Sequence, residues 1–271
     1  MKKSLLYVVA IDVVFIAFLM LSGIFRGIVS DIVYFAAFIL PFVIFLLTSK
    51  KYGMERHRLT VLTDSAGFGI TFSVAAPTVL LVFGLSMLTG WLVSMFATPP
   101  VIELEDNVFY AIILHALVPA VLEEALFRYI PLTLITPHSR KCAVILSSVL
   151  FAFAHCNLAQ LPYALVAGII FAWCDLAAGS IAPSVILHFV NNAVAIVWQK
   201  YIYGTDGVPI FVSVLVILAL FSAIPIFLMR GRLKASMAFL RDKSDRMVLT
   251  REIAVYMVIT LALSLITVFV R

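Results

Sequence analysis

Nine long apolar runs follow one another along almost the whole chain, and they limit what it can fold into more than any other feature. They cover residues 5–25, 28–48, 68–96, 108–135, 142–156, 161–178, 181–198, 208–229 and 253–270. A helix needs about 20 apolar residues to cross a bilayer. Hydrophobic residues make up 64% of the chain, whereas soluble domains are about 45–50% apolar. The sequence therefore predicts an all-α, polytopic membrane protein with eight or nine transmembrane helices, because the run 142–156 is short.

The first run follows Met1-Lys2-Lys3, as in a signal peptide, but it is longer than the usual apolar region of one and lacks an obvious cleavage site. We therefore expect a retained first span. We divide the chain into N-terminal transmembrane helices (1–104), a core that carries the polar motifs (105–200) and C-terminal helices (201–271). Prolines inside the runs are expected to kink helices; these are Pro77, Pro119, Pro162, Pro183 and Pro225.

Lysine and arginine are distributed unevenly between the two sets of loops that nine crossings define. The set that holds the N-terminus contains sixteen of them: Lys2, Lys3, Lys50, Lys51, Arg56, Arg58, Arg128, Arg140, Lys141, Arg230, Arg232, Lys234, Arg241, Lys243, Arg246 and Arg251. The other set contains Arg26, Lys200 and Arg271. By the positive-inside rule, the N-terminus is cytoplasmic and the C-terminus is outside. The short loops favour the inner membrane of a prokaryotic cell.

The net charge of +5 does not indicate a nucleic-acid partner, because the basic residues lie between apolar runs and not on one face of a soluble domain. Many of them lie in the segment 230–252, which we expect to be the main cytoplasmic loop. A helix lying on anionic lipid is the alternative for this segment. The cysteines Cys142, Cys156 and Cys174 are odd in number and scattered, so we expect small core residues and no disulfide framework.

Three short motifs place ionisable side chains within apolar runs. They are Glu123-Glu124-Ala125-Leu126-Phe127-Arg128, Phe151-Ala152-Phe153-Ala154-His155 and His188-Phe189-Val190-Asn191-Asn192. A charged side chain at the bilayer centre costs about 2.5–3.5 kcal/mol even on permissive insertion scales. We therefore interpret the three motifs as parts of one membrane-embedded functional site.

The two neighbouring glutamates point about 100° apart on a helix, so they face different surroundings. Arg128 follows Glu124 by four residues and shares its face, in the favourable order of acid before base. We expect Arg128 to neutralise Glu124, and a purely structural ion pair is the alternative for these two. Glu123 has no local partner, and burial would keep its carboxylate basic enough to activate water.

His155 lies one helical turn after Phe151, and by itself it is also explained as a hydrogen-bonded core residue. His188 and Asn192 are one turn apart and can point into one site. Their N–H groups are suitable donors to a developing oxyanion, and Asn191 is a rival for the same role. The remaining polar residues of the spans are expected to be packing, span-end or lipid-interface residues; these are Asp12, Asp31, Asp175 and His115.

In this order on successive apolar segments, the motifs resemble those of the CPBP family, the CAAX proteases and bacteriocin-processing membrane proteins that include the type II CAAX prenyl endopeptidases. The shared pattern is Glu-Glu-x-x-x-Arg, then Phe-x-x-x-His, then His-x-x-x-Asn, and the resemblance covers roughly residues 105–200. It implies a helical membrane fold with a conical cavity that is open to the membrane and the cytoplasm.

The resemblance further implies an intramembrane glutamic endopeptidase that needs no metal or other cofactor and acts on a membrane-associated protein or peptide. Carried onto this chain, the catalytic residues are Glu123, His155, His188 and Asn192, supported by Glu124 and Arg128. In the family, the first glutamate and the first histidine hold and activate water. The second histidine and the asparagine four residues later stabilise the oxyanion.

Two other functions are alternatives at this point. One is a zinc protease with Glu and His ligands, although the chain has no His-Glu-x-x-His motif, and persistence of activity in strong chelator would exclude it. The other is a non-enzymatic membrane protein, such as an immunity factor, a scaffold or a transporter that uses the carboxylates as a proton relay. Nothing in the sequence distinguishes CAAX-like, leader-peptide and sorting-tag substrates or indicates an oligomeric state.

Overall fold

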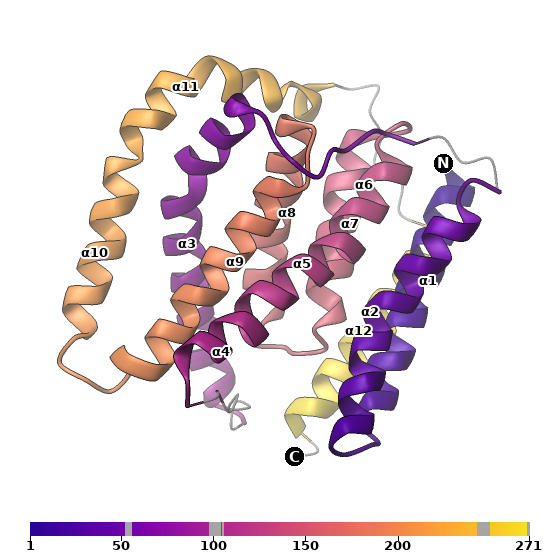
Figure 1. Ribbon diagram of the computed structural model, residues 1–271, viewed down its shortest axis with the longest axis horizontal. Helices are drawn as coiled ribbons and strands as arrows, with labels where there is room; N and C mark the ends of the chain where they lie inside the picture. Colours follow the sequence, from indigo (N-terminus) through magenta and orange to yellow (C-terminus); the bar gives the residue numbers. More distant parts are fainter. Residues whose placement is uncertain (52–55, 98–103, 105, 243–249, 270–271) are drawn as a thin grey trace.

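The computed structural model describes residues 1–51, 56–97, 104, 106–242 and 250–269, and all regular elements in these ranges are helices (Figure 1). The longer ones are α1 (Lys2–Ser22), α2 (Ile28–Thr48), α3 (Ser65–Ser94), α7 (Arg140–Ala154), α8 (Leu161–Ala178), α9 (Ala182–Val197), α10 (Val208–Phe221), α11 (Ala223–Ser236) and α12 (Arg251–Phe269). Extended pairing in the same ranges is limited to one parallel β-bridge between Thr60 and Ser180. The all-α prediction is confirmed.

Polar residues at the ends of the apolar runs start and stop these helices. The side chains of Asp64 and Ser139 precede α3 and α7 and accept hydrogen bonds from backbone N–H groups of the first turn, at 2.8 and 2.9 Å. Such caps satisfy donors that have no intrahelical acceptor. Gly179 ends α8 with φ 64°, a left-handed conformation that glycine adopts without strain. The apolar runs therefore set the lengths of the helices, and the capping residues and Gly179 set where these helices begin and end.

Five helices are long and apolar enough to cross a membrane: α1, α2, α3, α8 and the continuous helix over Val108–Ile135. The predicted span 208–229 is instead the pair α10 and α11, which meet at 44° and count as a sixth span if taken together. Pro225 explains this bend, because it cannot donate a hydrogen bond to the carbonyl of Phe221. The molecule is thus a multi-pass membrane protein. The helices α7 and α9 have only 15 and 16 residues, so the count of eight or nine stays a prediction.

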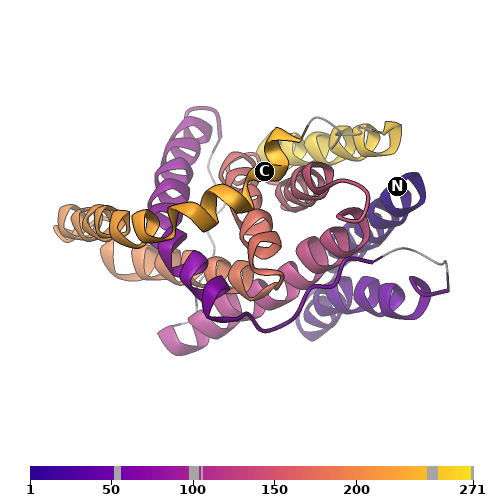
Figure 2. The ribbon, with the colours of Figure 1, turned by 90° about the horizontal axis from the view of Figure 1, so that it is seen from above.

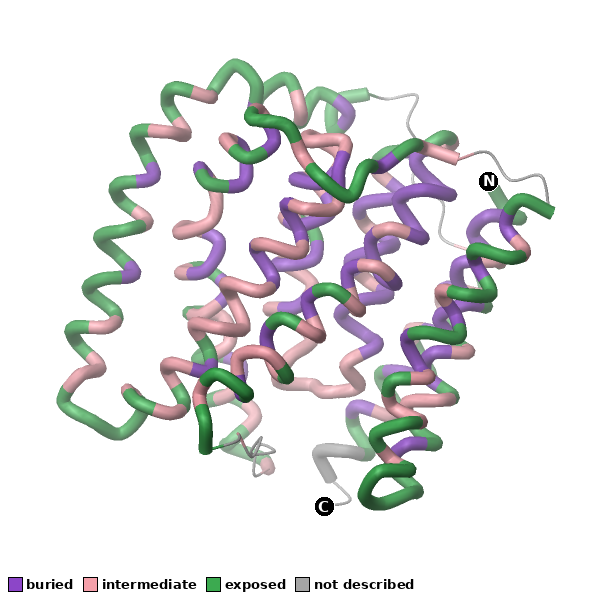
Figure 3. The backbone as a smooth tube through the Cα atoms, in the orientation of Figure 1, coloured by how far each residue is buried: buried purple, intermediate pink, exposed green. Residues whose placement is uncertain are grey.

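The helices between residues 108 and 197 form the centre of the molecule, between two outer groups (Figures 1 and 2). On one side, α1 contacts α2 and α12 and also packs on α6 and α7. On the other side, α3 packs on α8 and α9 and is covered by α10 and α11. Figure 3 shows that buried residues are concentrated in the central helices. Large apolar side chains such as Leu220 and Leu228 are exposed on the outer helices, where a membrane protein meets lipid.

Two π-helical turns interrupt the continuous helix over Val108–Ile135. The order is α4 (Val108–Ile112), η1 (Ile113–Leu117), α5 (Val118–Glu124), η2 (Ala125–Tyr129) and α6 (Ile130–Ile135). Each π turn precedes a proline, Pro119 or Pro131, in the first turn of the next segment. Because proline lacks an N–H and crowds the preceding turn, a wider turn accommodates it. The carbonyl of Phe127, which Pro131 cannot pair, accepts a hydrogen bond from Nη1 of Arg128 at 3.3 Å.

Two sequence expectations about helix ends need correction. Pro162 and Pro183 do not kink helices but lie in the first turns of α8 and α9. Proline is favoured there because the first N–H groups of a helix have no acceptor within it. The segment 230–252 is not a simple loop, since α11 continues to Ser236 and a 3₁₀ turn, η4 (Ala238–Arg241), follows. Residues 243–249 of that segment lie outside the described part of the chain.

The helices α7 and α8 approach each other closely at Gly168. A Cβ atom at this position would lie 3.0 Å from both Cα and Cβ of Ser148, and 3.3 Å from Nη2 of Arg128. Small residues at such contacts let membrane helices pack backbone to backbone. Gly168 therefore brings α8 against α7 and also leaves space for the Arg128 side chain.

Candidate active site

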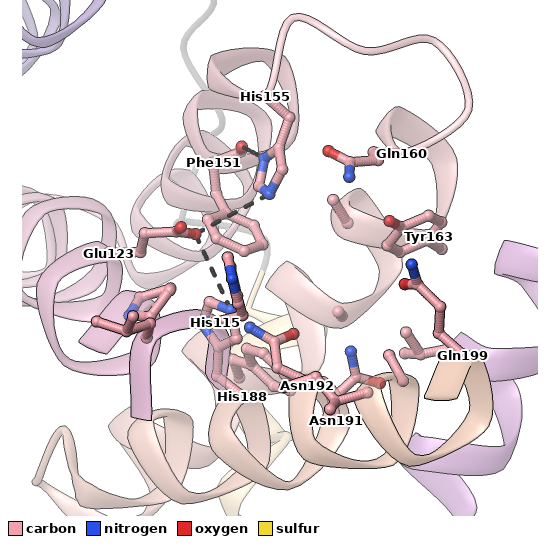
Figure 4. Close-up of a pocket in the computed structure, with 18 of the residues that line it drawn as sticks. His115, Glu123, Phe151, His155, Gln160, Tyr163, His188, Asn191, Asn192 and Gln199 are labelled. Carbon is pink, nitrogen blue, oxygen red and sulfur yellow. Dashed lines mark hydrogen bonds and ion pairs between the residues drawn. The ribbon is translucent and has the colours of Figure 1, made fainter. Parts of the chain in front are cut away.

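A cavity of about 700 Å³ lies among α2, α3, α5, α7, α8 and α9 (Figure 4). The four side chains expected to be catalytic all line it: Glu123, His155, His188 and Asn192. They come from α5, from the end of α7 and from α9, so the tertiary fold brings together residues that are up to 69 positions apart. Much of the remaining wall is apolar, including Phe151, Ala164 and Phe171.

Glu123 faces both histidines across the inner part of this cavity. Its Oε2 lies 3.9 Å from Nε2 of His155 and 3.9 Å from Nε2 of His188. These separations are too long for direct hydrogen bonds, and a single water molecule commonly bridges polar atoms at such distances. The Glu123 side chain is 16% exposed, so its carboxylate meets the cavity and not the protein core.

Glu124 has entirely different surroundings. Its side chain is 0% exposed; Oε1 accepts a hydrogen bond from Nδ1 of His188 at 2.7 Å, and Oε2 lies 3.4 Å from Nε of Arg128. The ion pair expected from the four-residue spacing is therefore present. His188 is a second partner that spacing along one helix does not reveal. Because its other nitrogen faces Glu123, His188 connects the two carboxylates.

Aromatic rings hold Arg128 and the histidines in place. The guanidinium carbon of Arg128 lies 4.3 Å from the ring centroid of Phe151 and 6.0 Å from that of Phe171. A cation over an aromatic face is stabilised most when both are shielded from water. The Phe151 ring also meets the rings of His155 and His188 edge-on, at centroid distances of 4.8 and 5.6 Å. Phe151 thus contacts three polar groups of the site, which explains its place in the second motif.

His155 lies at the very end of α7, where the chain turns. Its Nδ1 donates a hydrogen bond to the carbonyl of Phe151 at 2.7 Å, which leaves Nε2 directed toward Glu123. The next residue, Cys156, has φ 45°, in the left-handed region that residues other than glycine rarely adopt. This local backbone strain ends the helix at the histidine and aims the imidazole into the cavity.

Asn191 and Asn192 both line the cavity from α9. In Figure 4 the Asn192 side chain lies on the His188 side of the cavity, whereas that of Asn191 points toward Gln199. This placement is consistent with the expected pairing of His188 and Asn192 one turn apart. The role of Asn192 stays a prediction.

Several polar side chains of the cavity are not among the site residues that the sequence predicts. Asp31 and His115, expected to be packing or span-end residues, line the cavity. Gln160, Tyr163 and Gln199 form a polar wall on the side opposite Glu123 (Figure 4). The sequence signal for them is weak, because each is a single polar residue near the end of an apolar run. Their proximity appears only when the ends of α8 and α9 converge.

Asp12 and Asp175 are buried and do not line the cavity, in agreement with a packing role. Oδ1 of Asp175 accepts a hydrogen bond from the backbone N–H of Ser184 at 2.9 Å. This bond ties the end of α8 to the first turn of α9, the helix that carries His188. Cys142 and Cys174 are buried, as expected of small core residues, and Cys156 is partly buried. Within the described ranges, no cluster of three or more His, Cys, Asp and Glu side chains is arranged to hold a metal ion.

Residues 105–194 match the family model of the type II CAAX prenyl endopeptidases, Rce1-like. The matched segment includes all three motifs and confirms the resemblance that those motifs indicated. No curated protein and no solved structure matches the chain. The division into residues 1–104, 105–200 and 201–271 stays a prediction.

Proposed function

From the premise that residues 105–194 are a Rce1-like domain of CAAX-protease type, we propose that the chain is a metal-independent glutamic endopeptidase of the membrane. The family match supports a membrane protease with a peptide or protein substrate. One observation carries the glutamate mechanism: Oε2 of Glu123 faces Nε2 of His155 and of His188, each at 3.9 Å, inside a largely apolar cavity. We also infer a prokaryotic inner membrane and a cytoplasmic N-terminus from the loop charges.

The first step is the activation of water between Glu123 and His155. Glu123 removes a proton while the water oxygen forms a bond to the carbonyl carbon of the substrate peptide. Because Nδ1–H of His155 is bonded to the carbonyl of Phe151, its Nε2 can accept the other hydrogen of the water. Positioned general bases contribute typically about 10²–10⁴-fold to rate.

The attack places a negative charge on the carbonyl oxygen, which needs hydrogen-bond donors. His188 supplies one from Nε2 in its doubly protonated form, because its Nδ1–H is bonded to Glu124. In that form the charges of His188 and Arg128 balance those of Glu123 and Glu124, so the buried cluster is neutral before reaction. Asn192 supplies the second donor through its side-chain amide.

Collapse of the tetrahedral intermediate breaks the carbon–nitrogen bond. The proton held by Glu123 moves to the leaving nitrogen, which departs as an amine and restores the carboxylate. Each turnover therefore creates one new carboxyl terminus and one new amino terminus. These termini are the direct evidence of the reaction.

The test compares protein termini, by mass spectrometry, in membranes of cells that carry the wild type, Glu123→Gln or Glu252→Gln at equal expression. Glu123→Gln keeps the shape and hydrogen bonding of the side chain but removes the base. Glu252, in the first turn of α12 and outside the cavity, is the matched control. We expect termini that are present with the wild type and the control and are reduced at least about 10²-fold with Glu123→Gln.

Identical termini in all three samples, with the proteins folded and the natural partners present, would contradict proteolysis and favour the immunity or scaffold alternative. Termini that persist in full with Glu123→Gln would show cleavage by another mechanism. Loss of cleavage in excess chelator, restored by zinc, would replace the metal-independent mechanism with that of a zinc protease.

A further inference from the structure

The described residues that line the cavity extend from the middle of the helices to one end of the molecule. Its inner part is formed by Glu123, Phe171 and His188. Its outer part is lined by residues at or next to helix ends, namely Asp31, Leu104, Gln160 and Gln199. All four lie at the end where α1, α3, α7 and α9 finish and α2, α4, α8 and α10 begin (Figure 1). We call this the mouth end, and the opposite end, where α1, α3, α7, α9 and α12 begin, the basic end.

The two ends differ in charge. The described part of the basic end carries thirteen lysines and arginines: Lys2, Lys3, Lys50, Lys51, Arg56, Arg58, Arg140, Lys141, Arg230, Arg232, Lys234, Arg241 and Arg251. Arg128 is not among them, because its side chain is buried beside Glu124 and does not lie in a loop. The described residues of the mouth end (23–31, 95–97, 104, 106–107, 155–160 and 198–207) include two bases, Arg26 and Lys200. The same described residues include three acids, namely Asp31, Asp106 and Asp206.

This asymmetry orients the cavity. Lysine and arginine near the ends of membrane helices stay on the cytoplasmic side. Thirteen of them against two, among the described residues, place the basic end in the cytoplasm and the mouth end on the opposite surface. The resemblance to the CPBP family implied a cavity open to the cytoplasm, so the charges of this chain and that expectation disagree.

We propose that the active site opens to the non-cytoplasmic side of the membrane, and that its substrate is an internal peptide segment of a membrane-anchored protein that emerges on that side. The substrate class rests on the proposed protease function, whereas the orientation does not. None of the residues that line the described cavity is lysine or arginine, and His188, the cation of the proposed mechanism, already faces Glu123 and Glu124, so no further cation is available there for a terminal carboxylate. For this reason we assign an internal segment and not a free C-terminus.

The depth of Glu123 restricts the substrate further. Glu123 lies fifteen residues from the start of α4 at the mouth end, which is about 22 Å at 1.5 Å per residue. An extended peptide covers about 3.3–3.6 Å per residue, so roughly six or seven residues lead from the surface to the cleaved bond. The substrate segment must therefore be extended and locally unfolded. Gln160, Tyr163 and Gln199 offer neutral hydrogen-bonding groups to its backbone along this path.

Single cysteines at the two ends test the orientation. In a variant with Cys142→Ala, Cys156→Ala and Cys174→Ala that is present in the membrane at the wild-type level, Asp206→Cys marks the mouth end and Pro137→Cys marks the basic end; both positions are exposed. Cells or spheroplasts are treated with a membrane-impermeant maleimide, before and after permeabilisation. We expect Asp206→Cys to be labelled in intact cells and Pro137→Cys only after permeabilisation. The reverse pattern overturns the proposal.

Two further measurements test the orientation independently of the cysteine variant and test the substrate class. If the cysteine-free variant does not fold, an alkaline phosphatase fused after Arg271 of the unaltered chain reports the same topology, because α12 runs from the basic end toward the mouth end. Activity of the phosphatase supports the proposal, and an inactive fusion at normal expression contradicts it. The positions of the Glu123-dependent termini test the substrate class: they should all lie in non-cytoplasmic segments, and cytoplasmic positions overturn it. Absence of any such termini defeats the protease function but leaves the labelling result standing.

Discussion

Two adjacent glutamates differ in what surrounds them, and the proposed chemistry depends on that difference. Glu124 is fully buried between Arg128 and His188, and Glu123 is left facing the cavity. Removing one partner from a buried ion pair typically costs about 3–5 kcal/mol, because the remaining charge is uncompensated. We therefore propose that Glu124 and Arg128 are a support that positions His188 and keeps the cluster electrically neutral.

At the residue scale, Asn192→Ala should lower the turnover number by about 10²–10³-fold with little change in KM, because an oxyanion donor acts mainly in the transition state. Asn191→Ala is the matched control, since both amides line the cavity from the same helix. The measurement is the cleavage rate of a peptide that contains the bond identified from the cellular termini, with purified protein.

The control should change the rate by less than about threefold, a small effect beside that of a lost oxyanion donor. A larger loss with Asn191→Ala than with Asn192→Ala would assign the role to Asn191. Small effects of both would argue against any oxyanion donor from this part of α9.

At the scale of the elements, the helix over Val108–Ile135 and the pair α7–α8 determine where the charged groups lie. The π turn η2 follows Glu124 directly and contains Arg128, and π turns occur frequently at functional sites. The contact of α8 with α7 at Gly168 closes the space around the Arg128 guanidinium. The position of Arg128 therefore depends on a proline in its own helix and on a glycine in another.

Gly168→Ala should reduce both stability and activity. Its Cβ would lie 3.0 Å from the backbone Cα of Ser148, which cannot move without shifting α7, and overpacking of this kind typically costs about 1–3 kcal/mol. The displaced Arg128 would also hold Glu124 less well. Thermal unfolding in detergent and the cleavage rate measure the two effects.

Gly84→Ala in α3 is the control for that substitution, because a Cβ there meets no atom within 4 Å. Alanine in place of glycine within a helix is neutral to favourable, so this variant should match the wild type or exceed it in stability. Equal stability of the Gly168→Ala variant and the wild type would mean that α7 and α8 can separate without penalty.

At the scale of the whole molecule, the charge of the cavity should select among substrates. Asp31 lines its mouth outside the neutral Glu123 cluster, and no lysine or arginine lines the cavity among the described residues. Substituting glutamate for a residue next to the cleaved bond should slow cleavage several-fold more than substituting lysine, because like charges repel more strongly where water is partly excluded. Peptide variants assayed at low and high salt measure this preference.

Asp31→Asn should reduce the difference in cleavage rate between the glutamate and lysine peptides. Added salt should reduce it too, because Asp31 lies at the exposed mouth of the cavity. An unchanged preference in this variant would place the selecting charge elsewhere. A faster reaction of the glutamate peptide than of the lysine peptide would contradict the electrostatic argument altogether.

Several features could be predicted from the sequence because they depend on composition or on positions along one helix. The apolar runs predict a helical membrane protein, since the bilayer leaves no other way to satisfy so many backbone groups. The four-residue spacing predicts the contact between Glu124 and Arg128 from helix geometry alone. The three motifs together also predicted which side chains would share one cavity, with the family resemblance as the guide.

Only the tertiary structure decided that His188 bonds to Glu124, that Asp31 and Gln160 belong to the cavity, and at which end the cavity opens. The physical reason is that contacts between helices depend on how whole surfaces pack. That packing is set by residues remote from the site in sequence, such as Gly168 and Pro131, whose effects no local pattern around the motifs contains. The charges of the loops can be read from the sequence. They orient the active site only in combination with the fold, which opens the cavity at the end opposite the basic end.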